Sequence, residues 1–357
     1  MVNAINQQRR RFFGTAAAAL AVAQFGPAGA ASAQAAPAAP AAAGAAASGA
    51  AGPQSGVAPS FGQLKQIDAG LLNIGYVEAG PANGAPVLLL HGWPYDVHAF
   101  AEVTPILAAA GYRVIVPHLR GHGTTRFLSN ATFRNAQQSA VALDIIALMD
   151  ALKIPKAVIG GFDWGARTAC IIAALWPERC KALVSVSGYL VTNIDTRTVP
   201  LPPKGEHDWW YQYYLATDRG AAGYAKNTRD FAKYIWQTAS PQWKFDDVTM
   251  DRSAASFANP DHVAIVLHNY RWRQGAAPGE ARYDEFEKRL AAGPAITVPT
   301  ITMEGDANGA PFPPPAAYRS KFTGKYEHRN LTGGIGHNLP QEAPKAFAQA
   351  VLDVAAF

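Results

Sequence analysis

The sequence predicts an α/β protein with a mostly parallel, eight-stranded sheet, helices on both faces of the sheet and a helical cap after the sixth strand. Three observations predict this fold. Short apolar runs alternate with amphipathic helical patterns from Phe61 onward, and a glycine-flanked turn follows one of the buried strands. The alternation then stops between residues 189 and 294, where helical patterns and aromatic residues dominate. Strands that alternate with helices form parallel sheets, because parallel neighbours need a crossover connection.

The individual elements follow in order along the chain. The predicted strands are short apolar runs bounded by turn residues, at 86–90, 113–116, 156–160, 181–186, 298–303 and 325–331. The predicted helices carry an apolar face that repeats every three or four residues, at 100–110, 137–152, 166–176 and 341–354. The sheet and its helices are therefore expected in two parts, residues 61–188 and 295–357. The cap between them, residues 189–294, is expected over the carboxyl ends of the strands, where ligands bind in such sheets.

The first 60 residues lie outside this pattern. Arg9-Arg10-Arg11 precedes an alanine-rich run and the small-residue site Ala31-Ser32-Ala33, which predicts a twin-arginine export signal over residues 1–33. Residues 34–60 are almost all Ala, Pro, Gly and Ser, a composition typical of a disordered linker. We therefore expect a periplasmic or secreted bacterial protein without a stable membrane span. A basic tail and an N-terminal anchor are the alternatives, but the apolar run is short and rich in alanine.

Composition excludes several function classes. The formal charge of +5 comes from 31 basic and 26 acidic side chains, and without the three N-terminal arginines it falls to +2. Nucleic acid and acidic membranes are therefore not expected as partners. Cys170 and Cys180 are the two cysteines, too few for a disulfide framework, and Cys170 is expected in the core. The nine histidines show no metal-ligand spacing, so neither a metal nor a cofactor is expected. The oligomeric state stays open.

Asp163 is the predicted nucleophile. It stands at the centre of Gly161-Phe162-Asp163-Trp164-Gly165, between the strand at 156–160 and the helix at 166–176. Such a pentapeptide forms a nucleophile elbow, in which the glycines permit a strained turn that exposes the central side chain. A serine there would transfer acyl groups, whereas an aspartate displaces at carbon and forms an alkyl-enzyme ester.

Two further segments lie where such a nucleophile needs them. His91-Gly92-Trp93-Pro94 follows the strand at 86–90, so the backbone N–H groups of Trp93 and Trp164 are expected to form an oxyanion hole. His337 follows the last strand, from which a base can reach the elbow. Each motif alone also fits an ordinary turn or a surface histidine. Their combination, in this order and strand context, favours a hydrolase.

From about Leu64 to the C-terminus, the chain resembles the epoxide hydrolase and haloalkane dehalogenase branch of the α/β-hydrolase superfamily. The resemblance rests on the elbow, the His-Gly-Trp-Pro loop and the segment 336–344. It implies the α/β-hydrolase fold, and it implies that Tyr211 and Tyr270 of the cap donate hydrogen bonds and a proton to the opening epoxide oxygen. A phenol with a pKa near 10 suits that role. Both tyrosines also fit ordinary packing aromatics of the cap.

The substrate pocket is expected to be apolar and aromatic. With the oxyanion-hole tryptophans, the candidates for its lining are His91, Phe162, Trp209 and Trp210. The expected partner is therefore a small apolar or aromatic epoxide.

The residue that orients His337 is open. The resemblance implies Gly-x-x-Asp after the strand at 298–303, whereas this chain has Gly305-Asp306-Ala307-Asn308. Either Asp306 takes the role from a shifted loop or Asn308 does, and Asp306 is favoured. An asparagine can fix the imidazole tautomer, but it cannot stabilise an imidazolium by charge.

These observations predict a cofactor-independent epoxide hydrolase. The first alternative is a haloalkane or haloacid dehalogenase that uses the same Asp163 ester. Against it, Trp93 stands where a halide-binding asparagine is usual, and only Arg167 remains of the arginine pair that holds the carboxylate in fluoroacetate-type dehalogenases. The second alternative is a non-catalytic ligand-binding homologue, which Asn308 favours and the intact Asp163 and His337 oppose.

Overall fold

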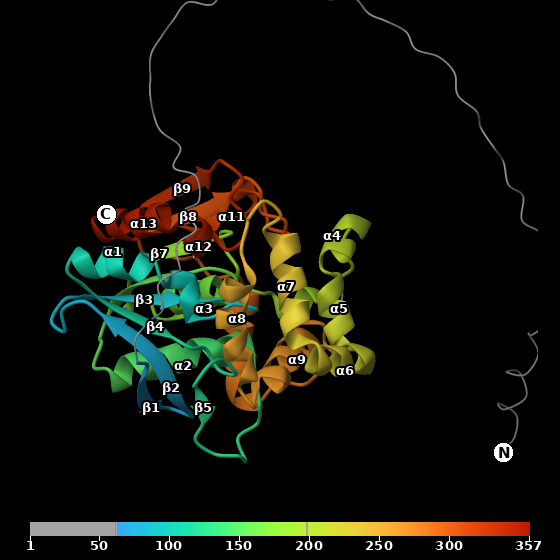
Figure 1. Ribbon diagram of the computed structural model, residues 1–357. Helices are drawn as coiled ribbons and strands as arrows, with labels where there is room; N and C mark the ends of the chain where they lie inside the picture. The colour runs from blue at the N-terminus through green and yellow to red at the C-terminus, as the bar shows by residue number, and fades with distance from the viewer. Residues whose placement is uncertain (1–60, 62, 198) are drawn as a thin grey trace, which may run out of the picture. The chain divides into compact units, whose positions relative to one another are not determined.

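The protein is described by a computed structural model that covers residues 61, 63–197 and 199–357 (Figure 1). The predicted export signal and linker, residues 1–60, lie outside the described residues. Within the described part, no helix combines the length and hydrophobicity that crossing a bilayer requires.

The central sheet has nine strands, one more than predicted, and it is mixed. Its strands are β1 (Lys65–Ala69), β2 (Leu72–Ala79), β3 (Ala85–Leu90), β4 (Tyr112–Pro117), β5 (Arg126–Phe127), β6 (Ala157–Gly161), β7 (Cys180–Val186), β8 (Thr300–Gly305) and β9 (Tyr326–Leu331). Eight of them follow the order β1-β2-β4-β3-β6-β7-β8-β9, and the two-residue β5 pairs with β2. All pairs from β4 to β9 are parallel, whereas β2 runs antiparallel to β1, β4 and β5.

Helices cover both faces of the sheet. They are α1 (Val103–Ala109), α2 (Gln138–Ala151), α3 (Trp164–Leu175), α11 (Pro315–Tyr318), α12 (Leu339–Glu342) and α13 (Pro344–Ala355). Leu88 and Leu90 of β3 point toward α2 and α3, whereas Val87 and Leu89 point toward α1 and α13. The strand is apolar throughout because successive side chains enter opposite cores.

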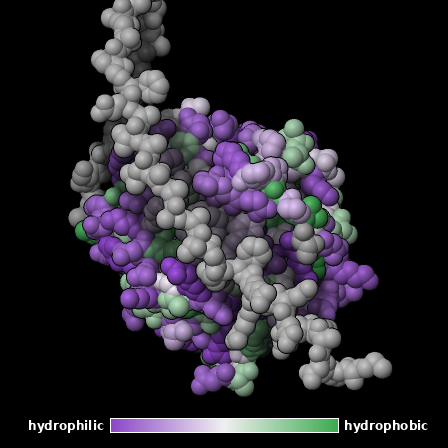
Figure 2. All heavy atoms as spheres, turned by 90° about the vertical axis from the view of Figure 1, so that its right-hand side faces the viewer, coloured by the Kyte–Doolittle hydropathy of each residue, from purple (hydrophilic) through white to green (hydrophobic). Residues whose placement is uncertain are grey.

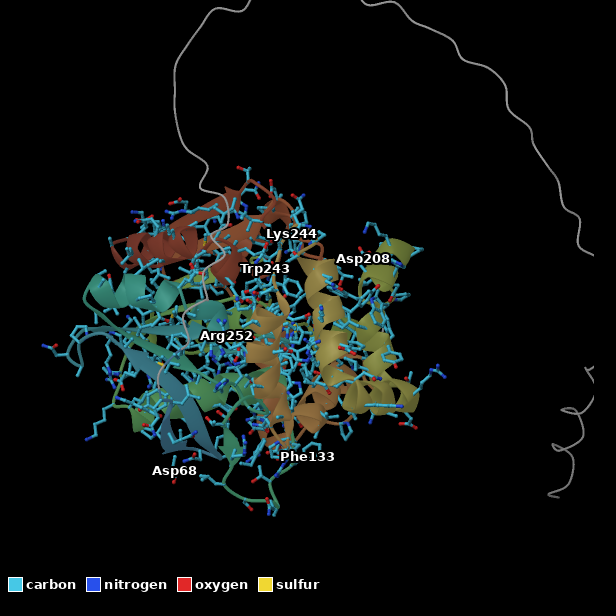
Figure 3. All side chains as sticks on the ribbon, viewed as in Figure 1. Asp68, Phe133, Asp208, Trp243, Lys244 and Arg252 are labelled. Atoms are coloured by element: carbon cyan, nitrogen blue, oxygen red, sulfur yellow. The ribbon has the colours of Figure 1, made fainter. Side chains whose placement is uncertain are left out.

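A helical segment separates β7 from β8, over the range predicted for the cap. It comprises α4 (Pro203–Asp208), α5 (Trp210–Ala216), α6 (Asp218–Lys226), α7 (Thr228–Ala239), α8 (Asp247–Ala254), α9 (His262–Arg273) and α10 (Asp284–Ala291). Side chains fill the space between these helices and the sheet (Figure 3). The face that the cap presents is mostly hydrophilic, with isolated hydrophobic residues (Figure 2).

Hydrogen bonds fasten the cap to the loop that follows β3. The Trp236 indole N–H of α7 donates to the Pro94 carbonyl at 2.9 Å, and the Ser253 hydroxyl of α8 donates to Asp96 at 2.8 Å. Both contacts are buried, so they are shielded from competition by water. The cap is thus anchored to the segment that also carries Trp93.

A buried ion pair ties the loop after β4 to α2. The Arg120 guanidinium donates from Nε and Nη2 to the two carboxylate oxygens of Asp144, at 2.6 and 2.7 Å. The same guanidinium donates to the carbonyls of Asn135 and Ala140. Because this charge is satisfied on all sides, removing its partner should be costly.

The cysteines lie as expected. Cys170 of α3 and Cys180 of β7 are both buried and both free. Burial raises the pKa of both thiols, which keeps them protonated at neutral pH.

Candidate active site

Asp163 lies on a sharp turn between β6 and α3. Its backbone has φ 52° and ψ −123°, a strained conformation for a residue with a side chain. The flanking glycines are required by close packing. A Cβ on Gly161 would lie 2.5 Å from the Gly165 carbonyl carbon, and one on Gly165 would lie 1.9 Å from the Leu90 carbonyl oxygen. The predicted elbow therefore has the expected geometry.

The His-Gly-Trp-Pro loop approaches this elbow closely. The Trp93 backbone N–H donates to Asp163 Oδ1 at 2.8 Å, and a Cβ on Gly92 would lie 2.4 Å from the Asp163 Cβ. The Trp164 N–H belongs to the first turn of α3, where backbone N–H groups have no acceptor within the helix. One predicted oxyanion-hole donor thus touches Asp163, and the other follows it directly in the chain.

His337 faces the same carboxylate from the loop after β9. Its Nε2 lies 3.5 Å from Asp163 Oδ2. The Ser240 hydroxyl fixes this loop, because it accepts from the His337 backbone N–H at 2.9 Å and donates to Glu342 at 2.6 Å. The cap helix α7, which ends just before Ser240, therefore helps to position the base.

The pair is strongly polarised. Burial by itself would lower the pKa of His337, but contact with the Asp163 carboxylate, and the charges of Glu304 and Glu342, raise it. Burial would likewise raise the pKa of Asp163, but His337, with contributions from Arg167 and the Trp93 N–H, lowers it. Both shifts favour an ionised Asp163 beside a protonated His337 in the resting enzyme.

The expectation for the residue that orients His337 needs correction. The Asp306 carboxylate accepts the backbone N–H groups of residues 333–335 at 2.9 to 3.0 Å, so it stabilises an exposed loop and is not bonded to His337. Asn308 donates from Nδ2 to Glu304 at 2.7 Å and to Ser187 at 3.4 Å, and it is not hydrogen-bonded to His337 either. The prediction that Asp306 orients His337 is wrong, because three backbone N–H groups of the neighbouring loop already donate to its carboxylate.

Glu304, which the sequence analysis missed, is not hydrogen-bonded to His337 either, but its charge acts on the imidazole, together with that of Glu342. Glu304 lies in β8, its side chain is buried, and it accepts the Asn308 amide. Burial raises its pKa, whereas the positive charge of His337 opposes that rise. The His337 Nδ1 has no hydrogen-bond partner among the described residues. The sequence analysis looked for the acid after the strand, at the Asp position of Gly-x-x-Asp, and no pattern in the sequence pointed to a glutamate within the strand.

Tyr211 of α5 and Tyr270 of α9 meet above Asp163. Their rings are nearly perpendicular at 5.5 Å, and the Tyr270 ring lies 5.1 Å from the Trp93 indole. Both tyrosines, Asp163 and His337 line one cavity of about 920 Å³. Burial is the main cause that raises the pKa of both phenols, and the Asp163 charge adds to the rise while the Arg273 charge opposes it, so the phenols remain proton donors at neutral pH.

The expected aromatic lining is only partly present. Trp93, Trp209 and Trp210 line the cavity, but His91 and Phe162 do not. His91 is fully buried, and its ring nitrogens bond the Leu119 N–H and the Gly92 carbonyl, so it holds the loop in place. Phe162 packs beneath the elbow against Tyr95 and Phe100. Phe162 points into the core because its neighbour in the chain, Asp163, points into the site.

The cavity also contains two arginines. Arg167 of α3 was noted in the sequence, but its partner Arg273, the last residue of α9, was missed. The available signal was its spacing, because Arg273 lies one helical turn after Tyr270 and shares that face of the helix. Within the described part of the chain, no group of three His, Cys, Asp or Glu side chains could hold a metal ion.

Known proteins with similar sequences and structures belong to the α/β-hydrolases. A family model described as alpha/beta hydrolase fold matches residues 85–225. An epoxide hydrolase of Caballeronia sordidicola is 31% identical over 277 residues, which cover 70% of this chain and 80% of that protein. A haloalkane dehalogenase of Mycobacterium marinum is 31% identical over 212 residues, 56% of this chain and 67% of that protein. A crystal structure from Klebsiella pneumoniae, provisionally assigned as an epoxide hydrolase, shares 62% identity with a TM-score of 0.83, and it covers 84% of this chain and 100% of that one.

Proposed function

Because the chain belongs to the α/β-hydrolase fold family, in its epoxide hydrolase and haloalkane dehalogenase branch, we propose that it hydrolyses an epoxide to a vicinal diol through an ester on Asp163. One observation carries this proposal. Asp163, His337, Tyr211 and Tyr270 line the same cavity, with the carboxylate between a backbone N–H and the imidazole. These are the groups that ring opening and ester hydrolysis require.

The first step is ring opening. The ionised Asp163 carboxylate attacks the less hindered ring carbon, and the bond from that carbon to the epoxide oxygen breaks. The electron pair moves to the oxygen, to which Tyr211 and Tyr270 donate hydrogen bonds and one of them a proton. An alkoxide in this pocket would otherwise be costly, because few water molecules can solvate it.

The second step is hydrolysis of the ester. The ester no longer carries the charge of Asp163, so the main cause of the raised pKa of His337 is gone and the imidazole becomes neutral. His337 then takes a proton from water, and the resulting hydroxide attacks the ester carbonyl carbon. The Trp93 and Trp164 N–H groups stabilise the oxyanion. As the carbonyl re-forms, the bond to the diol oxygen breaks, and His337 returns the proton to it. Asp163 is left as a carboxylic acid, whose proton restores the tyrosine that protonated the alkoxide, and the imidazole regains from solvent the proton that it lost when the ester formed.

Glu304 is proposed to support this second step. Its buried carboxylate stabilises the imidazolium that forms when His337 takes the proton. It is a positioning residue, since nothing places it in contact with the substrate.

A single-turnover experiment in H₂¹⁸O tests the mechanism. With excess enzyme and styrene oxide, the first diol should carry an unlabelled oxygen from Asp163, and the label should appear in the Asp163 peptide. The Asp163→Asn variant serves as the control and should form no diol. Labelled diol in the first turnover would mean direct attack by water and would refute the ester.

One observation favours dehalogenation as a second candidate function. The Trp164 indole N–H is buried and has no hydrogen-bond acceptor among the described residues. Trp164 does not itself line the cavity, but its ring lies 6.0 Å from the cavity-lining Tyr270, so a halide between the two could accept this N–H. The Trp93 indole N–H, in contrast, already donates to the Tyr224 hydroxyl at 2.8 Å. Release of bromide from 1-bromobutane at a rate comparable to epoxide turnover would support this candidate.

Export is a further part of the proposal. The Arg9-Arg10-Arg11 run and the Ala31-Ser32-Ala33 site support delivery of the folded protein to the periplasm by the twin-arginine route. Sequencing the N-terminus of periplasmic protein should place the cleavage after Ala33, and replacing Arg9 and Arg10 by lysine should retain the protein in the cytoplasm.

A further inference from the structure

Each half of the candidate site pairs a catalytic side chain with an arginine one helical turn later. On α3, Arg167 follows Asp163, and its backbone N–H donates to the Asp163 carbonyl at 3.0 Å. On α9, Arg273 follows Tyr270 by three residues. Residues three or four apart lie on the same helix face. Both arginines accordingly line the cavity that contains Asp163 and Tyr270.

Neither arginine has an acidic partner of its own. Among the described residues, Arg167 and Arg273 form no salt bridge closer than 4.0 Å with a carboxylate. The one side-chain hydrogen bond described for Arg167 is a 3.3 Å contact to the Leu190 carbonyl, and the Arg273 Nε is buried without any partner. Burial, and next the charge of Arg273, lower the pKa of Arg167 to about 10. A lowered pKa means that the surroundings disfavour the charged form of the guanidinium.

The acids that line the cavity do not balance these charges. The Asp163 carboxylate already faces His337 at 3.5 Å, and its charge disappears when the ester forms. Asp208, labelled on α4 in Figure 3, pairs with Lys204 at 2.5 Å. The site therefore holds a surplus of positive charge throughout the reaction. Both arginines are only partly buried, but a charge without an opposite partner at such a position is still costly, so this surplus indicates a missing anion.

Arg271 shows what a structural arginine does on the same helix. It lies on α9 two residues before Arg273, does not line the cavity, and donates to Asp218 at 3.2 Å and to the Thr217 carbonyl at 3.4 Å. The Nε of Arg271 is buried without a partner, like that of Arg273, so the difference lies in the remaining nitrogens: those of Arg271 bond to the cap, whereas no side-chain hydrogen bond is described for Arg273, which lines the cavity. The contrast separates a cap-stabilising role from a ligand-binding one.

We propose that Arg167 and Arg273 form a carboxylate subsite, so that the substrate is an epoxide bearing a carboxylate group. This inference rests on the proposed epoxide hydrolase function. A guanidinium presents parallel N–H donors that match a carboxylate in a planar, bidentate geometry. The carboxylate is bound by the arginines while the ring oxygen lies against Tyr211 and Tyr270. The aromatic walls then contact the middle of the substrate, which modifies the purely apolar substrate expected from the sequence.

Matched substrates test the subsite. trans-3-Phenylglycidate carries the carboxylate, and 3-phenylglycidamide replaces it by a neutral group of similar size. For the wild-type protein, we expect kcat/KM to be at least roughly tenfold higher for the acid than for the amide. Arg273→Gln should lower kcat/KM for the acid roughly 10- to 100-fold and for the amide less than about threefold. Arg271→Gln, which removes an equal charge from the same helix, should preserve the preference, and Arg273→Lys should restore part of it.

The outcomes separate this inference from the proposed function. Equal kcat/KM values for acid and amide in the wild-type protein, or an equal loss for both in Arg273→Gln, would overturn the subsite while leaving epoxide hydrolysis in place. If neither epoxide is turned over, the proposed function fails, and calorimetric binding of 3-phenylpropanoate and 3-phenylpropanamide decides the subsite. Tighter binding of the acid, lost in Arg273→Gln, supports the subsite, and equal binding overturns it.

Discussion

Neutralising Asp163 should convert His337 from an acid into a base. In Asp163→Asn the carboxylate becomes a neutral amide of almost the same shape, as it does in the ester. At the Nε2–Oδ2 distance of 3.5 Å, Coulomb's law with an effective dielectric constant of about 20 gives an attraction of about 5 kcal/mol between the two charges. The pKa of His337, raised in the wild-type protein, should therefore fall below the ordinary value of about 6.5 in the variant.

The direction of this pKa shift explains the sequence of the two chemical steps. Below its raised pKa, His337 is protonated and stabilises the Asp163 carboxylate in the free enzyme. When that carboxylate becomes an ester, the pKa drops, and the imidazole can accept a proton from water at neutral pH. The charge of Asp163 thus determines both steps: while it is present, Asp163 is the nucleophile, and once the ester removes it, His337 can act as the base.

Histidine side-chain NMR measures the shift directly. The His337 resonance, assigned from its absence in His337→Gln, is titrated in the wild-type protein and in Asp163→Asn. Asp208→Asn serves as the control, because Asp208 also lines the cavity but pairs with Lys204. A fall of less than about half a unit in Asp163→Asn, or an equal fall in the control, would refute the proposed coupling.

Three further predictions follow from the same contacts. Tyr211→Phe and Tyr270→Phe should each lower kcat/KM for epoxides, by roughly 10²- to 10⁴-fold for the tyrosine that gives the proton and less for the one that gives only a hydrogen bond, and diol formation measures this; an unchanged rate would remove that tyrosine from the mechanism. Glu304→Gln should slow ester hydrolysis more than ring opening, so the covalent ester should accumulate in rapid-quench mass spectra; equal slowing of both steps would indicate a general structural role. Asp144→Ala should reduce the free energy of unfolding in urea by about 3–5 kcal/mol, since it leaves the Arg120 guanidinium buried without its partner; a loss below about 1 kcal/mol would contradict this.

The parts of the fold that the sequence predicts are the doubly buried parallel strands. β3 and β6 are continuous apolar runs because both of their faces are covered. β1 is different, since its residues are mostly exposed and antiparallel to β2, and the two-residue β5 is too short to show any pattern. The apolar runs therefore located six strands, and the three that they did not locate are β1, β2 and β5.

The site divides in a similar way. Asp163 and Trp93 could be located from sequence because each belongs to a local motif that directly follows a strand. Arg273 and Glu304 could not, since their relation to the site depends on how the cap and the last strands pack. Asp306 was misassigned for the same reason, because its three N–H donors come from a loop 27 to 29 residues further along the chain.

Trapping the covalent ester tests whether Asp163 is the nucleophile. Purified His337→Gln protein is incubated with styrene oxide and, separately, with 1-bromobutane, and its intact mass and peptide map are recorded. We expect a mass increase of one epoxide molecule, on the peptide that contains Asp163. An adduct on another residue, or full steady-state turnover by this variant, would contradict it. An alkyl adduct on Asp163 with release of bromide, without an epoxide adduct, would move the assignment to a dehalogenase.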